Sequence, residues 1–455
     1  MGFLSDIFYF IIVIAVLVVI HEFGHFLAAR LCGVRADVFS VGMGARLFGW
    51  NRRTGFTLGK LPEDLELEGK TDWRLSLLPI GGYVKISGMV DESFDTDFAG
   101  KPAEPWEFRS KGTLAKVFIL TGGVLMNFLS AIIIFSALTY SNGEIDLATT
   151  KIAYVGSGTV AEKIGFQKGD EILSVNGKNT DSWGNALELL TLEDFGSNRN
   201  IVVNRNGGQV TLNVRGSEII KALADQKNIG IEPAGKRLVL QMVETARPAG
   251  KVGLKGGDTV LTLGGDVVVG FDQFTGILKK HKEKPVVIEV KRGSAVISDT
   301  LVPDSDGKIG VQFGFDYTGA IIKKEFGPIE SISAGWNQTI GSIELFYGSI
   351  SQLFKGNISF KQSFGGPIMI ANQASKSAER GLDSFLTFLA MLSITLAVIN
   401  ILPFPALDGG HLLFTIIEGI IRREIPIKVK MAFQQAGIII LLLFMAIVLY
   451  NDIVR

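Results

Sequence analysis

Four stretches of the chain are apolar for long enough to cross a bilayer. A membrane-spanning helix needs roughly 20 consecutive apolar residues. The first stretch follows Asp6 without the basic segment of a signal peptide and stays apolar beyond a short polar interruption, so we expect a retained helix. The four predicted spans are Phe8 to Ala29, Val117 to Tyr140, Ser384 to Leu402 and Met431 to Tyr450.

The segment between the second and third spans is polar and rich in glycine, with short Val and Ile runs that are typical of strands. It contains an internal repeat. The sequence IGFQKGDEILSVNGK at Ile164 to Lys178 returns 88 residues later as VGLKGGDTVLTLGGD at Val252 to Asp266. NIGIE at Asn228 likewise returns as KIGVQ at Lys308. We therefore predict two small β-rich domains.

Two further stretches have a regular pattern. Pro328 to Gly356 places apolar residues at helical spacing, which predicts either an interfacial helix or a plain connector. Trp73 to Gly88 has strand-like stretches around a Pro-Ile-Gly-Gly turn, and Ala36 to Gly42 is suited to pair with part of it.

Composition supports a membrane protein with sizeable polar parts. The chain has 455 residues, which corresponds to about three domains, and hydrophobic residues make up 47% of it. Lys and Arg together number 45, as do Asp and Glu, so no charge excess favours nucleic acid as a partner. The single Cys32 excludes an internal disulfide and leaves the redox compartment undetermined.

Positive charges in the short loops predict the orientation, because cytoplasmic loops carry an excess of Lys and Arg. Basic residues crowd the loop after the first span and the link between the last two spans. They are Arg30, Arg35, Arg46, Arg52 and Arg53, and then Arg422, Arg423, Lys428 and Lys430. We therefore place both loops in the cytoplasm, and both termini and the long middle segment outside.

The first span carries three polar groups within VVIHEFGHFLAA, residues 18–29. His21 and His25 are four residues apart, so on a helix both imidazoles face the same way, and Glu22 follows the first. In an H-E-x-x-H motif the two histidines hold zinc and the glutamate is the general base. An ionisable residue at bilayer depth costs about 2.5 kcal/mol or more, so three together require a compensating partner such as a divalent cation. A polar stripe between packed helices is the competing interpretation.

A third zinc ligand must come from elsewhere, because hydrolytic zinc sites usually take three protein ligands and keep one position for water. The third span ends in NILPFPALDGGH, Asn400 to His411, where two prolines interrupt regular helix hydrogen bonding. Irregular backbone at membrane depth is tolerated only where it is buried in protein or lines a cavity. Asp408 follows beside two glycines, which predict a flexible turn, and we expect it to be the third ligand. His411 is the rival ligand, with a supporting or structural role as its alternative.

These features together resemble the site-2 protease family of intramembrane zinc metalloproteases, M50. The shared features are H-E-x-x-H in a first membrane helix, N-x-x-P-x-P-x-L-D-G in a later one, and tandem repeats between them that resemble bacterial PDZ domains. The resemblance covers essentially the whole chain. It implies one zinc ion per chain held by His21, His25 and Asp408, with Glu22 as the catalytic base and Asn400 helping to hold substrate near the metal.

The resemblance also implies the fold class and the partners. The fold class is a polytopic α-helical membrane protein with four transmembrane helices, a membrane-reentrant β-loop and two extramembrane PDZ-like β-rich domains. The substrate is a single-span membrane protein in the lipid bilayer, typically an anti-sigma factor already trimmed outside the membrane, or a signal-peptide remnant. The PDZ-like domains either bind peptide or substrate ends or act as bulky spacers. The location is the bacterial inner membrane, with the PDZ-like domains on the periplasmic side and the active site toward the cytoplasm.

The motifs divide the chain into expected segments. These are the first transmembrane helix (1–33), the reentrant β-loop region (34–112), the second transmembrane helix (113–140), the two PDZ-like domains (141–234 and 235–318), amphipathic or connector helices (319–382), the third transmembrane helix with its motif (383–421), and a basic loop with the fourth transmembrane helix (422–455).

Two stretches depart from the family pattern. The second span reads GGVLMNF, where the family often has Gly-Pro before the asparagine. Asn127 is therefore expected either to bind substrate by donating to an oxyanion or to bridge two helices as a buried amide. The loop after the first span carries TLGKLPEDLELEG, Thr57 to Gly69, which is either a natural hairpin extension or an engineered insertion.

Two other function classes compete. A metal transporter predicts a polar path with inverted repeated halves, whereas the repeat here lies in the extramembrane part. A catalytically silent PDZ scaffold has no need for Glu22 beside two metal-spaced histidines. The sequence has no G-x-S-x-G, which disfavours a serine hydrolase of that type.

Overall fold

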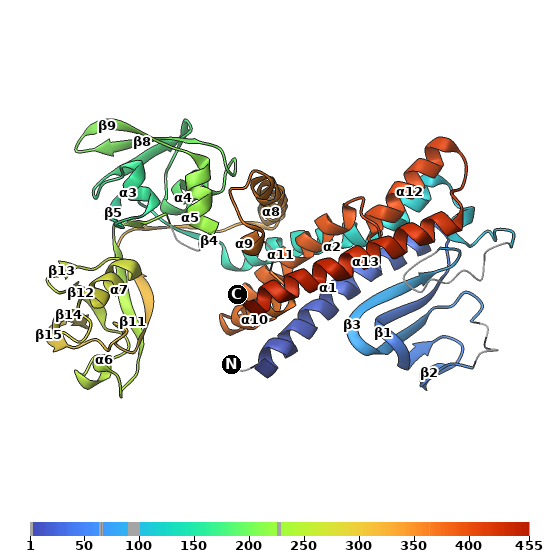
Figure 1. Cartoon of the computed structure of the whole chain (residues 1–455), viewed down its shortest axis with the longest axis horizontal. Coiled ribbons are helices and arrows are strands. Elements are labelled where there is room, and N and C mark those ends of the chain that lie inside the picture. Colours follow the sequence, from blue (N-terminus) through green and yellow to red (C-terminus); the bar gives the residue numbers. More distant parts are fainter. Residues whose placement is uncertain are drawn as a thin grey trace. The chain divides into compact units, whose positions relative to one another are not determined.

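The structure is a computed structural model that describes residues 3–62, 65, 67–89, 101–224, 229–363 and 365–454. It divides into two compact units. The first combines Met1–Gly143, Glu325–Tyr347 and Phe364–Arg455, and the second combines Glu144–Lys324 and Gly348–Ser363. The second unit is therefore inserted between helices of the first (Figure 1).

Four helices among the described residues are long and apolar enough to cross a membrane, which confirms the four predicted spans. They are α1 (Phe3–Leu31), α2 (Thr113–Asn142), α11 (Leu382–Ile401) and α13 (Ile427–Val454). α2 ends where Gly143 takes a positive φ of 65° and donates its N–H to the Thr139 carbonyl. Glycine suits this position because it has no Cβ to oppose a positive φ.

Glycines let α1 and α2 approach backbone to backbone. A methyl group on Gly24 would lie 2.1 Å from the Gly122 carbonyl oxygen, and one on Gly122 would lie 2.6 Å from that of Gly24. Small residues at membrane helix interfaces allow this close contact, which van der Waals attraction then stabilises. On α1 the contact is made by Gly24, which lies between His21 and His25 in the sequence, and on α2 it is made by Gly122.

The stretch at Pro328 to Gly356 forms one helix, α8 (Pro328–Phe354). Within the first unit it packs on α2, because a methyl group on Gly335 would lie 2.3 Å from Ser136 Oγ and Trp336 meets Phe128 edge-on at 5.5 Å. A 3-10 helix at Phe108–Ser110 precedes α2. Two helices follow α8, namely α9 (Phe360–Ser363) and α10 (Pro367–Glu379).

The segment 383–421, expected to contain the third membrane helix and its motif, contains two helices. α11 ends at Ile401, and Leu402 is extended with ψ of 141°, as the residue before a proline prefers. The chain then turns through Ala406, whose φ of 71° is left-handed, and α12 (Asp408–Ile421) begins. Asp408 therefore lies at the first position of a helix and not on the flexible turn that its two neighbouring glycines suggested.

A sheet packs beside the second half of α1 (Figure 1). It consists of β1 (Ala36–Asn51), β2 (Gly55–Leu58) and β3 (Asp72–Ile86) in the order β2-β1-β3. Val38 pairs with both Asp72 and Lys85, so the two halves of β3 flank the same part of β1, and the predicted pairing of Ala36 to Gly42 with this stretch is confirmed. The Pro-Ile-Gly-Gly residues, predicted as a turn, lie within the continuous strand β3. Phe26 of α1 contacts the sheet through the Trp73 ring at 4.9 Å.

The long acidic loop is built into this sheet at its beginning. Thr57 and Leu58 belong to β2, and the guanidinium of Arg46 donates to the Thr57 hydroxyl at 2.8 Å and to the Asp72 carboxylate at 3.0 Å. Arg46 of β1 and Asp72 of β3 are almost fully buried, so the Arg46 guanidinium links β1 to β3 through Asp72 and to β2 through Thr57. Residues 63, 64 and 66 of this loop lie outside the described residues.

The two copies of the repeat form sheets with the same strand pairing in the second unit. The first copy pairs β7-β6-β8-β9, and the second pairs β13-β12-β14-β15. In each copy a helix follows the short strand. The bounds are β6 (Glu171–Val175), β7 (Lys178–Asn179), α4 (Trp183–Thr191), β8 (Arg199–Arg205) and β9 (Gly208–Val214), then β12 (Thr259–Leu263), β13 (Asp266–Val267), α7 (Phe271–Lys280), β14 (Val286–Arg292) and β15 (Ala295–Leu301).

The two ends of the larger segment of the second unit, Glu144–Lys324, are joined by a strand pair. β4 (Glu144–Leu147) pairs with β17 (Ile321–Lys324), so the insertion begins and ends at one place. The remaining elements of this unit are β5 (Ile152–Val155), α3 (Val160–Ile164), α5 (Gly216–Ala224), β10 (Ile231–Pro233), β11 (Lys236–Val243), α6 (Pro248–Lys251) and β16 (Val311–Tyr317).

Candidate metal centre

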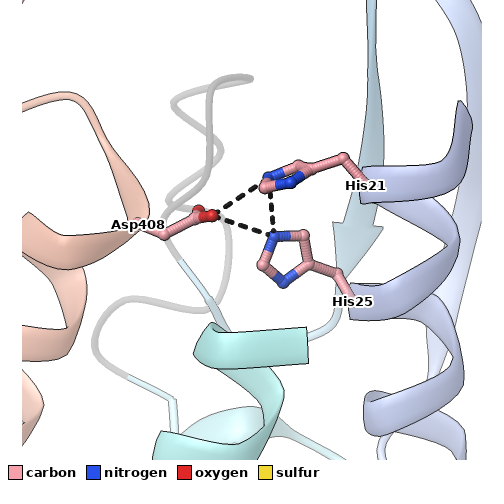
Figure 2. A group of neighbouring side chains, drawn as sticks. All are labelled: His21, His25 and Asp408. Atoms are coloured by element: carbon pink, nitrogen blue, oxygen red, sulfur yellow. Dashed lines mark hydrogen bonds and ion pairs between the residues drawn. The ribbon is translucent and has the colours of Figure 1, made fainter. Parts of the chain in front are cut away.

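Three side chains from two helices converge on one point in the first unit (Figure 2). Asp408 Oδ2 lies 3.0 Å from His21 Nε2 and 3.2 Å from His25 Nε2, and the two nitrogens are 3.3 Å apart. The two histidines are 7% and 8% exposed, and the Asp408 side chain is 18% exposed. The fold therefore brings together the three residues that were expected to be ligands.

The spacing of the histidines on α1 explains why their two rings lie together. His21 and His25 are separated by one helical turn, so their rings lie on one face, with centroids 4.9 Å apart and planes at 80°. The His25 ring is held by α2, because its Nδ1 lies 2.9 Å from the Ile119 carbonyl oxygen. This hydrogen bond directs the other ring nitrogen, Nε2, toward the point of convergence.

The backbone before α12 accounts for the position of Asp408. Methyl groups on Gly409 and Gly410 would lie 2.0 Å and 2.5 Å from the carbonyl oxygens of Leu402 and Phe404. Only glycine therefore lets the first turn of α12 fold back onto the preceding loop. The same turn places the Asp408 carboxylate at a helix N-terminus, where negative charge is favourable.

Gly123 of α2 lies directly beneath the two imidazoles. A methyl group there would be 2.5 Å from His25 Nε2 and 2.7 Å from His21 Nε2, so any side chain would occupy the point of convergence. Sequence reasoning missed this residue. The signal that could have found it is the Gly122-Gly123 pair in the middle of a predicted membrane helix, where glycine marks close approach.

The two asparagines of the sequence prediction both lie against His21. Asn127 of α2 is fully buried, and its Nδ2 lies 3.1 Å from His21 Nδ1. Asn400 of α11 is 9% exposed, and its Nδ2 lies 3.3 Å from His21 Nε2, the atom that faces Asp408. Asn400 therefore reaches the point of convergence, whereas Asn127 reaches the opposite side of the ring.

Glu22 lies between α1 and the last part of β3. A methyl group on Gly82 would lie 2.8 Å from Val18 Cγ1 and 3.7 Å from Glu22 Cγ, so the strand passes α1 at the glutamate. The described strands pair with this half of β3 only on the β1 side, which leaves its other edge available for a further strand. The edge of β3 thus approaches α1 at Glu22, the residue that follows His21 in the sequence.

His411, the rival ligand, lines a different space. It borders a pocket of about 200 Å³ together with Leu120, Phe414 and Lys116, and the cluster formed by His21, His25 and Asp408 does not include it. The geometry favours Asp408 over His411 as the third ligand.

The donor set fits a catalytic zinc ion. The three ligand atoms all lie within 4.8 Å of one another, and two imidazole nitrogens with one carboxylate oxygen form a common set for hydrolytic zinc. Imidazoles with their protons on Nδ1 direct two lone pairs at the carboxylate, and no Lys or Arg among the described residues pairs with Asp408. A divalent cation would relieve this convergence of lone pairs and leave one coordination position open.

Comparisons with known proteins agree with this chemistry. The chain matches peptidase family M50 over residues 9–444. It is 32% identical to a protein of Neisseria meningitidis whose name proposes a zinc metalloprotease, over 98% of each chain. It is also 29% identical to the regulator of sigma-E protease RseP of Escherichia coli over 100% of each chain, and 30% identical to that of Salmonella typhimurium over 98% of each.

Proposed function

The chain belongs to peptidase family M50 and is a metalloprotease of a bacterial membrane, and from that premise we propose that it cleaves single-span membrane proteins within or near their transmembrane segment. The observation that carries the proposal is the convergence of Asp408 with His21 and His25 of α1, the helix that β3 contacts at Glu22, where no described strand pairs with the other edge of β3. A peptide bond that reaches this place meets a metal site, a base and a hydrogen-bonding partner together.

The roles of the residues follow from their chemistry. His21, His25 and Asp408 hold one zinc ion per chain, and that ion supplies Lewis-acid activation of water and of the peptide carbonyl. Glu22 accepts the proton of the attacking water and delivers it to the nitrogen of the leaving amine. The Asn400 amide donates to substrate, because its Nδ2 faces the same point as the ligand atoms.

The strand edge answers a difficulty specific to membrane substrates. A transmembrane helix shields its peptide carbonyls with its own hydrogen bonds, and opening them in lipid leaves polar groups unsatisfied at a cost of several kcal/mol each. The free edge of β3 offers replacement main-chain hydrogen bonds to an unwound substrate beside Glu22. The sheet in this role is a membrane-reentrant β-loop.

The second unit controls access in this proposal. Its two β-rich copies are PDZ-like domains that lie on the periplasmic side, where they exclude bulky substrate ectodomains or bind trimmed ends. The substrate class is a pre-trimmed anti-sigma factor in the envelope stress response, because the names of several relatives refer to regulation of sigma-E. The termini also lie on the periplasmic side, and the active site lies toward the cytoplasm of the inner membrane.

The proposal is tested by metal analysis of the purified full chain paired with cleavage of a model single-span substrate. We expect about one zinc ion per chain, cleavage within or next to the transmembrane segment, and loss of cleavage with a chelator that zinc restores. Zinc that binds and crosses a vesicle membrane without any cleavage would instead support the competing transporter function.

A further inference from the structure

Asn127 occupies a position that neither cleavage nor substrate binding explains. Its side chain is fully buried on α2 and faces His21 Nδ1, on the side of the ring away from Asp408. Its Oδ1 has no hydrogen-bond partner among the described residues, although an unsatisfied buried amide oxygen costs free energy. An oxygen left without a partner next to a metal-type cluster requires an explanation.

The position of the proton on the His21 ring explains why this oxygen lies there. An imidazole that gives Nε2 to a metal carries its single proton on Nδ1. That N–H would then meet the Asn127 amide nitrogen, which is also a donor. A half turn of the amide about its last side-chain bond exchanges the oxygen and the nitrogen, because the two ends of an amide have nearly the same shape. The oxygen then accepts the Nδ1 proton across the 3.1 Å contact.

His25 is held in the same way by a different group. Its Nδ1 lies 2.9 Å from the Ile119 carbonyl oxygen, which is an acceptor only. Ile119, Gly123 and Asn127 are spaced four residues apart on α2, so they form one stripe of that helix. The stripe presents an acceptor, a gap without a side chain and a second acceptor to two histidines that are themselves four residues apart.

The position of Asn127 is fixed by α11. The hydroxyl of Ser130 donates to the main-chain carbonyl oxygen of Asn127 at 2.8 Å, and that of Ser393 donates to the same oxygen at 3.0 Å. The two hydroxyls are also 2.9 Å from each other. The backbone of Asn127 is therefore tied to α11, and its side chain faces α1.

We infer that Asn127 is a positioning residue, whose Oδ1 accepts the His21 Nδ1 proton and thereby holds Nε2 on the metal. This inference rests on the proposed zinc site. It assigns to Asn127 a role different from donation to an oxyanion, because the amide faces the ring nitrogen that points away from the reacting atoms.

The test is the zinc affinity of the full chain in detergent, measured by competition with a chromophoric chelator. Asn127→Leu keeps the size and removes the acceptor, and we expect it to bind zinc about 10- to 100-fold more weakly, as loss of such outer hydrogen bonds usually does. Asn127→Asp keeps an acceptor, and we expect it to bind zinc within about threefold of the wild type, since the ligand set is unchanged. The absorption bands of the cobalt-substituted protein should shift in Asn127→Leu and not in the control Ser393→Ala, which disturbs the link between Asn127 and α11 without touching His21.

Three results separate the possibilities. Unchanged zinc affinity in Asn127→Leu would overturn the inference, and unchanged affinity with a lower kcat would support the oxyanion role instead. Affinity as weak in Asn127→Asp as in Asn127→Leu, with both variants as heat-stable as Ser393→Ala, would also overturn it. If the wild type bound no zinc, or if His21→Ala bound as much zinc as the wild type, the proposed metal site itself would be wrong.

Discussion

Carboxylates in the two units have different partners, and the difference separates a structural role from a chemical one. In the repeats, Asp170 pairs with Arg205 at 2.8 Å and Asp258 pairs with Arg292 at 2.7 Å. Each also accepts a backbone N–H at 2.8 Å, from Gln167 in the first copy and from Lys255 in the second. In the membrane unit, Asp408 faces two imidazoles and no guanidinium among the described residues.

Asp170 and Asp258 in the repeats have all the partners that a buried carboxylate needs. A fixed cation and a backbone donor satisfy the charge and the lone pairs, so these side chains need nothing further and serve to close each copy of the fold. The Asp408 carboxylate faces two imidazoles, which are groups that can also bind a metal. A buried charge without a fixed counter-charge is costly, and a site that retains one is suited to bind a cation.

The sharpest test of this contrast removes Asp408. We expect Asp408→Ala to lose zinc and cleavage together, because two histidines are too few ligands for a hydrolytic site. The loss of affinity should exceed the 10- to 100-fold change typical of outer residues. Zinc content by mass spectrometry and cleavage of a single-span substrate measure the two effects. If His411→Ala lost the metal and Asp408→Ala kept it, the third ligand would be His411.

Removal of the base should separate binding from chemistry. We expect Glu22→Gln to lower cleavage by about 10²- to 10⁴-fold, since an amide keeps the shape of the side chain but accepts no proton. The zinc content should remain that of the wild type. Substantial chelator-sensitive turnover by this variant would contradict the role of Glu22.

Deletion of residues 144–324, the larger segment of the second unit, tests whether this unit gates access. β4 and β17 pair at the two ends of that segment, so a short linker can replace it. If the unit excludes bulky ectodomains, the deletion variant should cut an untrimmed substrate that the wild type resists, with zinc unchanged. If the unit recruits trimmed ends, the deletion should slow cleavage of the trimmed substrate. An untrimmed substrate that stays intact in a folded, zinc-loaded deletion variant would rule out the gate.

The complementary mutation in the repeats should affect stability and leave the metal alone. Asp258→Asn weakens charge-assisted hydrogen bonds to Arg292, and each such bond contributes about 1.5 to 3 kcal/mol. We expect hydrogen exchange to show that the free energy of opening of the second copy falls by about 2 kcal/mol. The zinc content and the hydrogen exchange of the first copy should stay unchanged. Loss of zinc in this variant would contradict the separation between the two kinds of carboxylate.

The smallest expected effect is a pH dependence of the second copy. Burial raises the pKa of Asp258, but the hydrogen bond from Arg292 and the N–H of Lys255 outweigh it and leave the pKa below its usual range. A lowered pKa contributes stability above the unfolded value of about 4, and that stability is lost as the pH falls through the folded value. Hydrogen exchange in the second copy should therefore accelerate below about pH 4, and less so in Asp258→Asn.

Much of the architecture could be predicted from local patterns in the sequence. The four spans follow from apolar runs, and the facing imidazoles of His21 and His25 follow from a four-residue spacing within one helix. The recurring sequence at Ile164 and Val252 returns as the same strand pairing. These features depend on periodicity within one element or on similarity between two segments, so no knowledge of packing is needed.

Other features were decided only by tertiary structure, because they depend on the register between elements far apart in the chain. The sequence offers both Asp408 and His411, and only the turn through Ala406 and the start of α12 bring the carboxylate to the imidazoles. The stripe of acceptors on α2 meets the two histidines because α1 and α2 pack together at that level, where Gly24 and Gly122 allow a close approach. The approach of β3 to Glu22 likewise requires the strand to double around β1. Local spacing therefore determines which way a side chain faces on its own helix, and packing determines what it meets there.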